Sequence, residues 1–492
     1  MARFPLPAVP SPLLDVEVAD VPRRGVPRAV LVPVREEGGD EPELVEGVRP
    51  PAKAGDVRSV PDAGTAPRWL VGVGTGAPEH YRGAGAALIR AANDYVAAEA
   101  EAGARPSKVV QIELGEQVRG EDVAELALGL LLGGYRYRVS ADAAKPAVRT
   151  VRLCTPFERA VPAYEQAVAR VRELAAASTL ARDLANAPSN IKDPAWLADT
   201  AERLADGVSG LKVTVRDERW LTEQGFGGVI AVGGGSASPP RLIELSYRPR
   251  VASKHLLLVG KGITFDTGGL SIKPADGMHL MRTDMAGGGA VIAAMRAIAA
   301  LRLGVRVTAL VPAAENHVSG SSYRPGDVVR HYGGKTTEVG NTDAEGRMVL
   351  ADALAYGIRR FDPDAVVDVA TLTGATKVAL GLRTGGLYAS DDELAHRVVA
   401  AGERTGEAWW RMPLLDAHVD AIRGELADVK QAPSGPGGVT AALFLREFTA
   451  GLPWAHLDIA GPARSEKNYA EVVPGGTGFA ARTLIELAAS YS

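Results

Sequence analysis

The hydrophobic and polar positions of residues 1–160 predict strands and helices in alternation. Short apolar runs bounded by turn-forming residues are typical of strands, and apolar residues three or four apart are typical of helices. The predicted strands cover residues 29–34, 69–73, 109–112 and 148–153, and the predicted helices cover residues 84–100 and 122–135. Residues 36–64 are acidic and rich in Gly and Pro, which predicts a solvated loop. Alternating strands and helices indicate a layered α/β fold.

Residues 162–187 have one long helical pattern, which would span roughly 40 Å at a rise of about 1.5 Å per residue. An Asn-Ala-Pro sequence ends the pattern, because the residue before a proline avoids the helical conformation. A long helix between two α/β patterns is a natural connector. We therefore predict an N-terminal α/β domain over residues 1–161, a linker helix over 162–187 and a C-terminal domain over 188–492.

The same patterns continue through the C-terminal part of the chain. Predicted strands cover residues 212–215, 229–232, 241–247, 255–260 and 305–312, and predicted helices cover 194–204, 219–224, 285–300 and 348–356. The continuous apolar run at 255–260 is typical of a strand that is buried on both faces. The predicted fold class is α/β: two α/β domains joined by a long helix. The C-terminal domain would be a central mixed sheet flanked by helices, and would carry the site.

Composition narrows the class of protein. The 492 residues are 46% hydrophobic and 23% charged, as in ordinary globular proteins, and a net charge of −4 predicts neither a polyanionic partner nor a membrane surface. Cys154 is the only cysteine, so no intramolecular disulfide forms, which fits a reducing compartment. No run approaches the ~20 apolar residues of a membrane helix, and residues 1–14 lack a secretory signal pattern. We expect a cytoplasmic location.

The candidate chemistry begins with the heptapeptide NTDAEGR at residues 341–347. If its backbone is extended, Asp343, Glu345 and Arg347 point to the same side, because alternate residues of a strand do so. Helix formers follow from Met348, so the cluster lies at a helix N-terminus, which favours anions. Two carboxylates this close repel each other unless a positive charge lies between them.

A second charged segment follows the buried strand at 255–260. Lys261, Asp266, Lys273 and Asp284 lie in what reads as a glycine-rich loop at the carboxyl end of that strand, where open α/β sheets place their sites. Together with the heptapeptide, this segment makes a set of four carboxylates and two lysines. Carboxylates gathered without cations would raise each other's pKa, and two divalent cations would resolve this conflict.

The type of ligand points to hard cations, since oxygens and one amine are available and no cysteine or HExxH motif is present. A lysine ligates only when it is neutral, and a nearby dication lowers its pKa. Asp266 and Glu345 are sensible bridging carboxylates, and Lys273 would be free to stabilise an oxyanion. Two metal ions a few Å apart can share a hydroxide and polarise a carbonyl.

These motifs resemble those of the leucyl (cytosol) aminopeptidase family of two-metal peptidases. The resemblance covers roughly residues 180–485 and is weak over the first domain. The motifs are VGKGITFDTGG at 259–269, KP at 273–274, NTDAEGR at 341–347, TLTGA at 371–375, PWAHLDIAG at 453–461 and GGTG at 475–478. The resemblance implies a metalloaminopeptidase that removes leucine-like N-terminal residues, with broad tolerance, by a two-metal mechanism with a bridging hydroxide.

The resemblance also implies roles for single residues. One tight metal ion would be held by Lys261, Asp266, Asp284 and Glu345, and a more exchangeable one by Asp266, Asp343, with its backbone carbonyl, and Glu345. Lys273 and Arg347 would be the catalytic pair, with bicarbonate bound at Arg347 as general base. The side-chain pocket would be lined by Met281, Thr371, Leu372, Thr373 and Gly374.

Cofactors and partners follow from the same resemblance. It implies two divalent ions per subunit, Mn or Zn, with Mg or Co as alternatives, and assembly as a homohexamer. The expected partners are peptide substrates and further copies of the chain, without membrane or nucleic acid. The glycine-rich segments at 72–76 and 333–336 lack the rest of a nucleotide-binding motif, so no nucleotide cofactor is expected. Two rival classes remain: a non-catalytic role such as DNA binding, and a metal-dependent phosphoester hydrolase.

Overall fold

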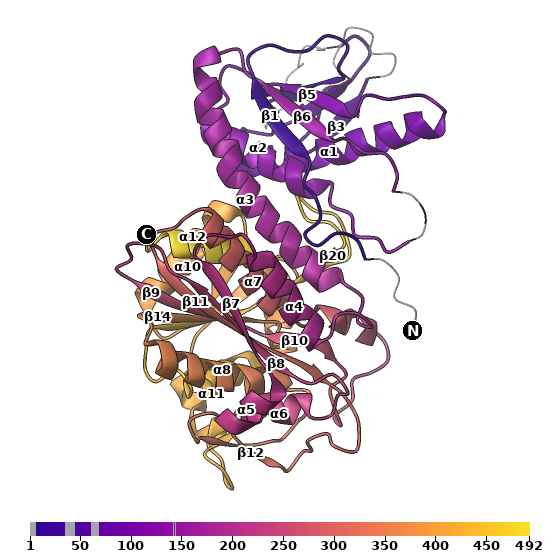
Figure 1. Cartoon of the computed structure of the whole chain (residues 1–492). Helices are drawn as coiled ribbons and strands as arrows, with labels where there is room; N and C mark the ends of the chain where they lie inside the picture. Colours follow the sequence, from indigo (N-terminus) through magenta and orange to yellow (C-terminus); the bar gives the residue numbers. More distant parts are fainter. Residues whose placement is uncertain (1–5, 35–44, 61–67, 141, 143) are drawn as a thin grey trace. The chain divides into compact units, whose positions relative to one another are not determined.

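The computed structural model describes residues 6–34, 45–60, 68–140, 142 and 144–492 (Figure 1). The chain divides into two compact units, Met1–Thr179 with Glu466–Pro474 and Leu180–Ser465 with Gly475–Ser492. This division falls within helix α3 (Val161–Asn186), whereas the sequence suggests boundaries at the two ends of that helix. The domain assignment from the sequence stays a prediction.

The first unit is a six-stranded sheet with helices packed on it. The strand order is β1 (Asp15–Ala19), β6 (Thr150–Cys154), β5 (Val109–Glu113), β2 (Arg28–Val32), β4 (Trp69–Gly72) and β3 (Val57–Ser59). Only the β3–β4 pair is antiparallel among these strands. Helices α1 (Pro78–Glu101) and α2 (Gly120–Gly133) pack closely, since a Cβ at Gly129 would lie 2.0 Å from the Arg82 carbonyl oxygen.

The second unit contains a nine-stranded mixed sheet. Its path is β16 (Ala408–Arg411), β15 (Thr384–Ala389), β18 (Trp454–Asp458), β14 (Ala365–Ala370), β9 (His255–Gly260), β11 (Arg306–Asn316), β8 (Arg241–Tyr247) and β7 (Leu211–Arg216), and β10 (Gly262–Asp266) pairs with β11. Strands β18, β14, β9 and β11 run parallel to one another, and β15, β8 and β7 bring in the antiparallel pairs. The α/β fold class with a mixed sheet in this part of the chain is therefore confirmed.

Helices cover both faces of this sheet (Figure 1). One layer contains α4 (Pro194–Ala205), α7 (Ala286–Ala300), α10 (Asp392–Thr405) and α12 (Ala481–Ala489), and the other contains α5 (Glu218–Gln224), α6 (Gly227–Gly233), α8 (Glu345–Phe361) and α11 (Gly437–Arg446). Helix α9 (Gly374–Leu380) follows β14. Two small sheets complete the unit: β12 (Val328–Arg330), β13 (Thr336–Glu338) and β17 (Val429–Lys430), and β19 (Arg464–Ser465) with β20 (Gly475–Gly476). The parallel strands end at one edge, which is where the site lies.

Some segments differ from their sequence-based predictions. Residues 36–64 are not entirely loop, because strand β3 pairs there with β4 at the edge of the first sheet. Residues 229–232 belong to helix α6 and not to a strand, since a short apolar run fits either element. Residues 262–266 form strand β10 beside β11, so the segment after β9 is not all loop; its Ile-Thr-Phe core favours the extended conformation.

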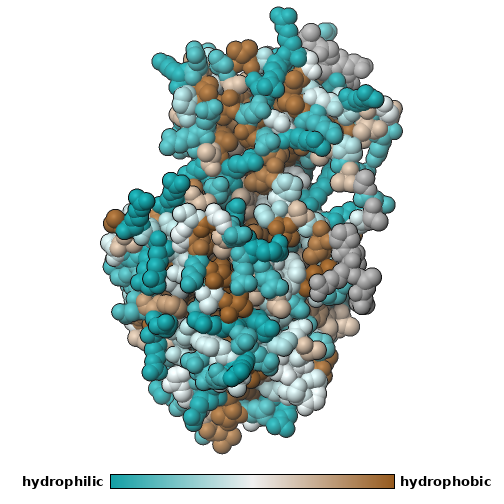
Figure 2. Space-filling model, in the orientation of Figure 1, coloured by the Kyte–Doolittle hydropathy of each residue, from teal (hydrophilic) through white to brown (hydrophobic). Residues whose placement is uncertain are grey.

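No helix in the described ranges is long and apolar enough to cross a membrane. The face shown in Figure 2 is mostly hydrophilic, with hydrophobic residues in small groups between polar ones. Cys154 is buried in strand β6.

Candidate functional site

The heptapeptide at residues 341–347 forms a turn that runs into the first turn of α8. The Asn341 side chain accepts a hydrogen bond from the Asp343 backbone N–H at 2.9 Å, and α8 begins at Glu345. The extended backbone that would point Asp343, Glu345 and Arg347 to the same side is therefore not present. Glu345 and Arg347 lie on a helix, where residues two apart point in different directions, so they serve different parts of the site.

Lys261 follows strand β9 and lies among buried carboxylates. Its Nζ is 2.7 Å from Glu345 Oε1 and 2.9 Å from Asp284 Oδ2, and it donates a hydrogen bond to the Thr371 carbonyl at 2.9 Å. A Cβ at Gly346 would lie 2.7 Å from Lys261 Cε, so glycine is needed for the lysine to approach α8 this closely. The glycine in the first turn of α8 therefore leaves the space that the Lys261 side chain occupies.

Lys273 pairs with the other carboxylates of the cluster. Its Nζ is 2.8 Å from Asp266 Oδ2, and it also forms an ion pair with Asp343. Asp266 ends strand β10, and its Oδ1 accepts hydrogen bonds from the Gly268 N–H at 2.9 Å and from Asn316 Nδ2 at 2.8 Å. These bonds orient the carboxylate so that its Oδ2 faces the rest of the cluster.

Three of the carboxylates converge on one point. Single oxygen atoms of Asp266, Asp343 and Glu345 all lie within 4.8 Å of one another. Within the described part of the chain, Asp343 Oδ1, Glu345 Oε1 and Asp284 Oδ2 are buried and accept no hydrogen bond, although each faces a lysine ammonium group. Carboxylate oxygens with unused lone pairs are the ligands that hard divalent cations take. The donor set therefore fits divalent metal ions.

Because these carboxylates are buried, keeping them ionised is energetically unfavourable unless a positive charge compensates them. Burial, together with the neighbouring Asp266 carboxylate, raises the pKa of Glu345 to about 8. Burial also raises the pKa of Asp284 and that of Asp343. For Lys261, burial alone would lower the pKa, but the surrounding carboxylates hold it above its usual range. A cation bound among these carboxylates would remove their mutual repulsion and stabilise the ionised forms.

Arg347 is buried in the first turn of α8 and is anchored by Gln431. Arg347 Nη1 donates a hydrogen bond to the Gln431 backbone carbonyl at 2.6 Å. The Gln431 side chain accepts from the N–H groups of Gly340 and Asn341 and donates to the Ala344 carbonyl. Burial lowers the pKa of Arg347 to about 10, which keeps the guanidinium charged at neutral pH. A guanidinium beside a helix N-terminus is suited to hold an anion.

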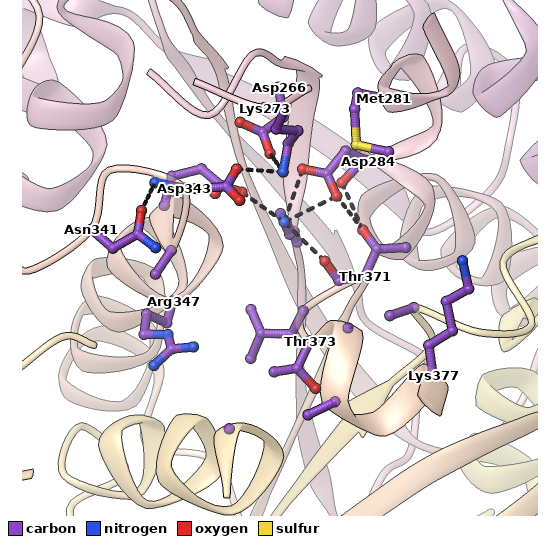
Figure 3. Close-up of a pocket in the computed structure, with 18 of the residues that line it drawn as sticks. Asp266, Lys273, Met281, Asp284, Asn341, Asp343, Arg347, Thr371, Thr373 and Lys377 are labelled. Atoms are coloured by element: carbon purple, nitrogen blue, oxygen red, sulfur yellow. Dashed lines mark hydrogen bonds and ion pairs between the residues drawn. The ribbon is translucent and has the colours of Figure 1, made fainter. Parts of the chain in front are cut away.

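One pocket of about 510 Å³ joins these groups (Figure 3). The predicted site residues that line it are Lys261, Asp266, Lys273, Met281, Asp284, Asp343, Glu345, Arg347, Thr371, Leu372, Thr373 and Gly374. Figure 3 shows Arg347 and Thr371 across the pocket from each other, with Asp343, Asp266, Lys273 and Asp284 above them in this view. The structure therefore brings all of the predicted site residues together, and their individual roles stay proposals.

The wall formed by residues 371–374 is held by Asp458 at the end of β18. This buried carboxylate accepts hydrogen bonds from the Leu372 N–H at 3.1 Å and from the Thr373 N–H and Oγ1 at 3.2 and 2.6 Å. Asp458 thus ties the loop after β14 to the neighbouring parallel strand β18.

Sequence reasoning missed Asn316, Gln431 and Lys192, which support the site from outside the motifs. Lys192 is 1% exposed, and its Nζ donates hydrogen bonds to three backbone carbonyls, including that of Arg282 at 2.5 Å. Arg282 precedes Asp284 by two residues, so the lysine holds the segment that carries this carboxylate. No spacing rule links these residues to the motifs, because only the folded chain brings them together.

Fold and site together define an α/β protein with a candidate metal site at the ends of its parallel strands, and the comparisons with known proteins give the family. Residues 179–485 match the family described as "Cytosol aminopeptidase family, catalytic domain". The chain belongs to the cytosol aminopeptidase family, whose members are peptide hydrolases.

Similar proteins extend the match over most of the chain. A "Probable cytosol aminopeptidase" of Streptomyces coelicolor is 45% identical over 441 residues, covering 85% of this chain and 84% of that protein. Another, of Syntrophotalea carbinolica, is 46% identical over 371 residues, 74% of each chain. The solved structure of the bottromycin maturation enzyme BotP in complex with Mn superposes with a TM-score of 0.82 at 41% identity, covering 94% of this chain and 98% of that one.

Proposed function

We propose that this protein is a cytoplasmic metalloaminopeptidase that removes leucine-like N-terminal residues from peptides, with broad tolerance, and that it uses two divalent ions. The observation that carries this proposal is the convergence of the Asp266, Asp343 and Glu345 oxygens within 4.8 Å of one another in a pocket that also holds Lys261 and Lys273. Membership of a peptidase family supports peptide hydrolysis as the reaction, and the carboxylates and lysines of the pocket support a metal-dependent mechanism.

The donor set divides into two groups that share carboxylates. Lys261, Asp266, Asp284 and Glu345 would hold one ion, and Asp266, Asp343 and Glu345 the other. Lys261 serves as a ligand only after losing its proton, which a nearby dication promotes by lowering its pKa. When bound, the two ions would supply Lewis-acid activation of the scissile carbonyl and of the attacking water.

The chain's own residues would orient the substrate and move its protons. The free α-amine of a peptide would bind at one of the two proposed metal sites, which restricts cleavage to the N-terminal end. The Lys273 ammonium group lies beside Asp266 and Asp343, and its charge would stabilise the oxyanion that develops on the carbonyl. Arg347 would hold a bicarbonate ion, which would supply a proton acceptor there.

The pocket wall proposed to receive the first side chain is formed by Met281 and residues 371–374. Leu372, Met281 and the small residues beside them offer an apolar surface for leucine or methionine. The absence of a bulky group at Gly374, where a Cβ would meet no atom within 4 Å, leaves room for other side chains. This combination supports a broad preference centred on medium-sized residues.

Metal identity and assembly belong to the same proposal. The oxygen-rich donors accept Mn, Zn, Mg or Co, and availability in the cell decides among them. The BotP structure in complex with Mn supports manganese as one candidate. We propose a homohexamer, which sedimentation would test: a mass of one chain, 51.4 kDa, at working concentration would contradict it.

The experiment that tests the function is cleavage of leucine p-nitroanilide by protein loaded with Mn²⁺ or Zn²⁺. The expected result is hydrolysis that a chelator abolishes and that added metal restores. N-acetyl-leucine p-nitroanilide is the control, since its blocked amine should prevent cleavage. Hydrolysis of bis-p-nitrophenyl phosphate without peptidase activity would favour a phosphoester hydrolase and contradict the proposal.

A further inference from the structure

Two cationic side chains line the pocket without belonging to the proposed metal ligands or catalytic pair. They are Lys377 on α9 and Arg464 on β19. In Figure 3 the Lys377 side chain runs along the side of the pocket where Met281 and Thr371 lie, opposite Arg347. This is the wall that the proposed function assigns to the first side chain of the substrate.

The geometry of α9 directs Lys377 to the pocket. Helical side chains lean toward the N-terminus of their helix and cover the preceding turn. The preceding turn begins at Gly374, three residues earlier and on the same helix face, and Gly374 lines the pocket. A Cβ at Gly374 would meet no atom within 4 Å, so the space beside Gly374 is open.

Lys377 also differs from Lys261, Lys273 and Arg347 in having neither an ion pair nor a side-chain hydrogen bond with another described residue. Lys261 and Lys273 each pair with two carboxylates, and Arg347 donates to a backbone carbonyl. Among the residues that the structure describes, none forms an ion pair or a side-chain hydrogen bond with Lys377. Its ammonium group is therefore available to a ligand, and its position selects for a negatively charged one.

We propose that this end of the pocket makes the enzyme accept acidic N-terminal residues, glutamate above all, with Lys377 as the specificity-determining cation and Arg464 adding positive charge. This inference rests on the proposed aminopeptidase function and names a substrate class for the same site. A glutamate side chain is long enough to pass the small wall residues Gly374 and Ala375 and to place its carboxylate near the ammonium group. An exposed pair of this kind is modest in strength and is weakened by salt.

The test compares kcat/KM for glutamyl, glutaminyl and leucyl p-nitroanilides at low ionic strength with Mn²⁺-loaded protein. Glutamate and glutamine differ in charge but hardly in size, so their ratio isolates the electrostatic contribution. Lys377→Gln should lower the Glu/Gln ratio about threefold, and Lys377→Glu about tenfold. Added salt should lower the wild-type ratio. Lys212→Gln, at an exposed lysine of β7 outside the pocket lining, is the matched control and should leave the ratio as in wild type.

The outcomes separate this inference from the function on which it rests. If leucine p-nitroanilide is cleaved but both Lys377 variants keep the wild-type Glu/Gln ratio within about twofold, the inference is wrong and the aminopeptidase function stands. If the Lys377 variants change the discrimination between Leu-Glu and Leu-Gln dipeptides instead, the carboxylate belongs to the second residue, and the assignment to the first side chain is overturned. If wild type cleaves none of these substrates, both proposals fail.

Discussion

Lys261 Nζ lies 2.7 Å from Glu345 Oε1, and both side chains are almost completely buried, with relative exposures of 4% and 1%. Removing one member of a buried ion pair leaves the other charge without compensation and is destabilising by about 3–5 kcal/mol. Lys261→Met should therefore lower the free energy of unfolding by about this amount when denaturation is followed in the presence of a chelator.

Lys273→Met is the matched control for this experiment. The Lys273 side chain is 21% exposed and that of its partner Asp343 is 33% exposed, so water can replace part of the lost pairing. We expect a loss of about 1–2 kcal/mol for this variant. Equal losses for the two variants, or no loss for Lys261→Met, would show that burial does not set the strength of these pairs.

The hydrogen bonds of Lys192 lead us to predict a local loss of stability, in residues 278–285, when this lysine is replaced. Its three hydrogen bonds go to the carbonyls of Leu184 and Ala185 at 2.9 Å and of Arg282 at 2.5 Å, so Lys192→Met leaves buried acceptors unpaired. Amide hydrogen exchange over residues 278–285 should accelerate about tenfold or more relative to strand β18, which corresponds to a local loss of at least about 1.4 kcal/mol.

Lys192→Arg tests whether the positive donor itself matters. An arginine keeps the charge and several donors, so it should restore part of the protection if space allows. Uniform acceleration of exchange across β18 and residues 278–285 in Lys192→Met would mean global destabilisation, and would contradict a specific role in holding the Asp284 segment.

The buried His255 predicts a pH dependence of stability. Its Nε2 lies 2.9 Å from Thr308 Oγ1, and burial, aided by nearby Arg306, lowers the pKa of His255 to about 4. The unfolded chain takes up a proton near its ordinary pKa of about 6.5, while the folded chain does not until about 4. Because the unfolded state binds more protons in this window, stability from this group falls as the pH drops from 6.5 toward 4.

The difference amounts to about 2 kcal/mol between pH 8 and pH 5. His255→Gln should therefore lose less free energy of unfolding over this range than wild type, as measured by urea denaturation at each pH. Other titrating groups are common to both proteins and cancel in the comparison. Parallel curves for the two proteins would contradict the lowered pKa of His255.

The sequence predicted the elements best where the pattern was long. Helices α7 and α8 follow from long helical patterns, and strand β9 follows from a continuous apolar run of the kind that is typical of a buried strand. The apolar run at residues 229–232 is too short to distinguish a helix from a strand, and in the structure it belongs to helix α6. The sequence placed a helix start just after the heptapeptide, and α8 begins slightly earlier, at Glu345, because the residues that follow form helix strongly.

The residues of the candidate site also differ in how readily the sequence reveals them. Closely spaced charges such as Asp343, Glu345 and Arg347 are visible in the sequence because they share one motif. Gln431 and Lys192 are not, since each acts through backbone groups that are distant in sequence and are brought near only by folding. Lys377 stands close to a motif, but its direction depends on α9, a short helix that the residue pattern did not predict.

The most direct test of the central claim is to measure bound metal and peptidase activity together, in wild type and Glu345→Gln purified side by side. The amide keeps the size of the side chain but removes the charge on which the proposed metal site depends. We predict that the folded variant, checked by circular dichroism, loses most of its bound metal by elemental analysis. Its cleavage of leucine p-nitroanilide should fall by more than about 100-fold. A variant with wild-type metal content and wild-type activity would contradict the account.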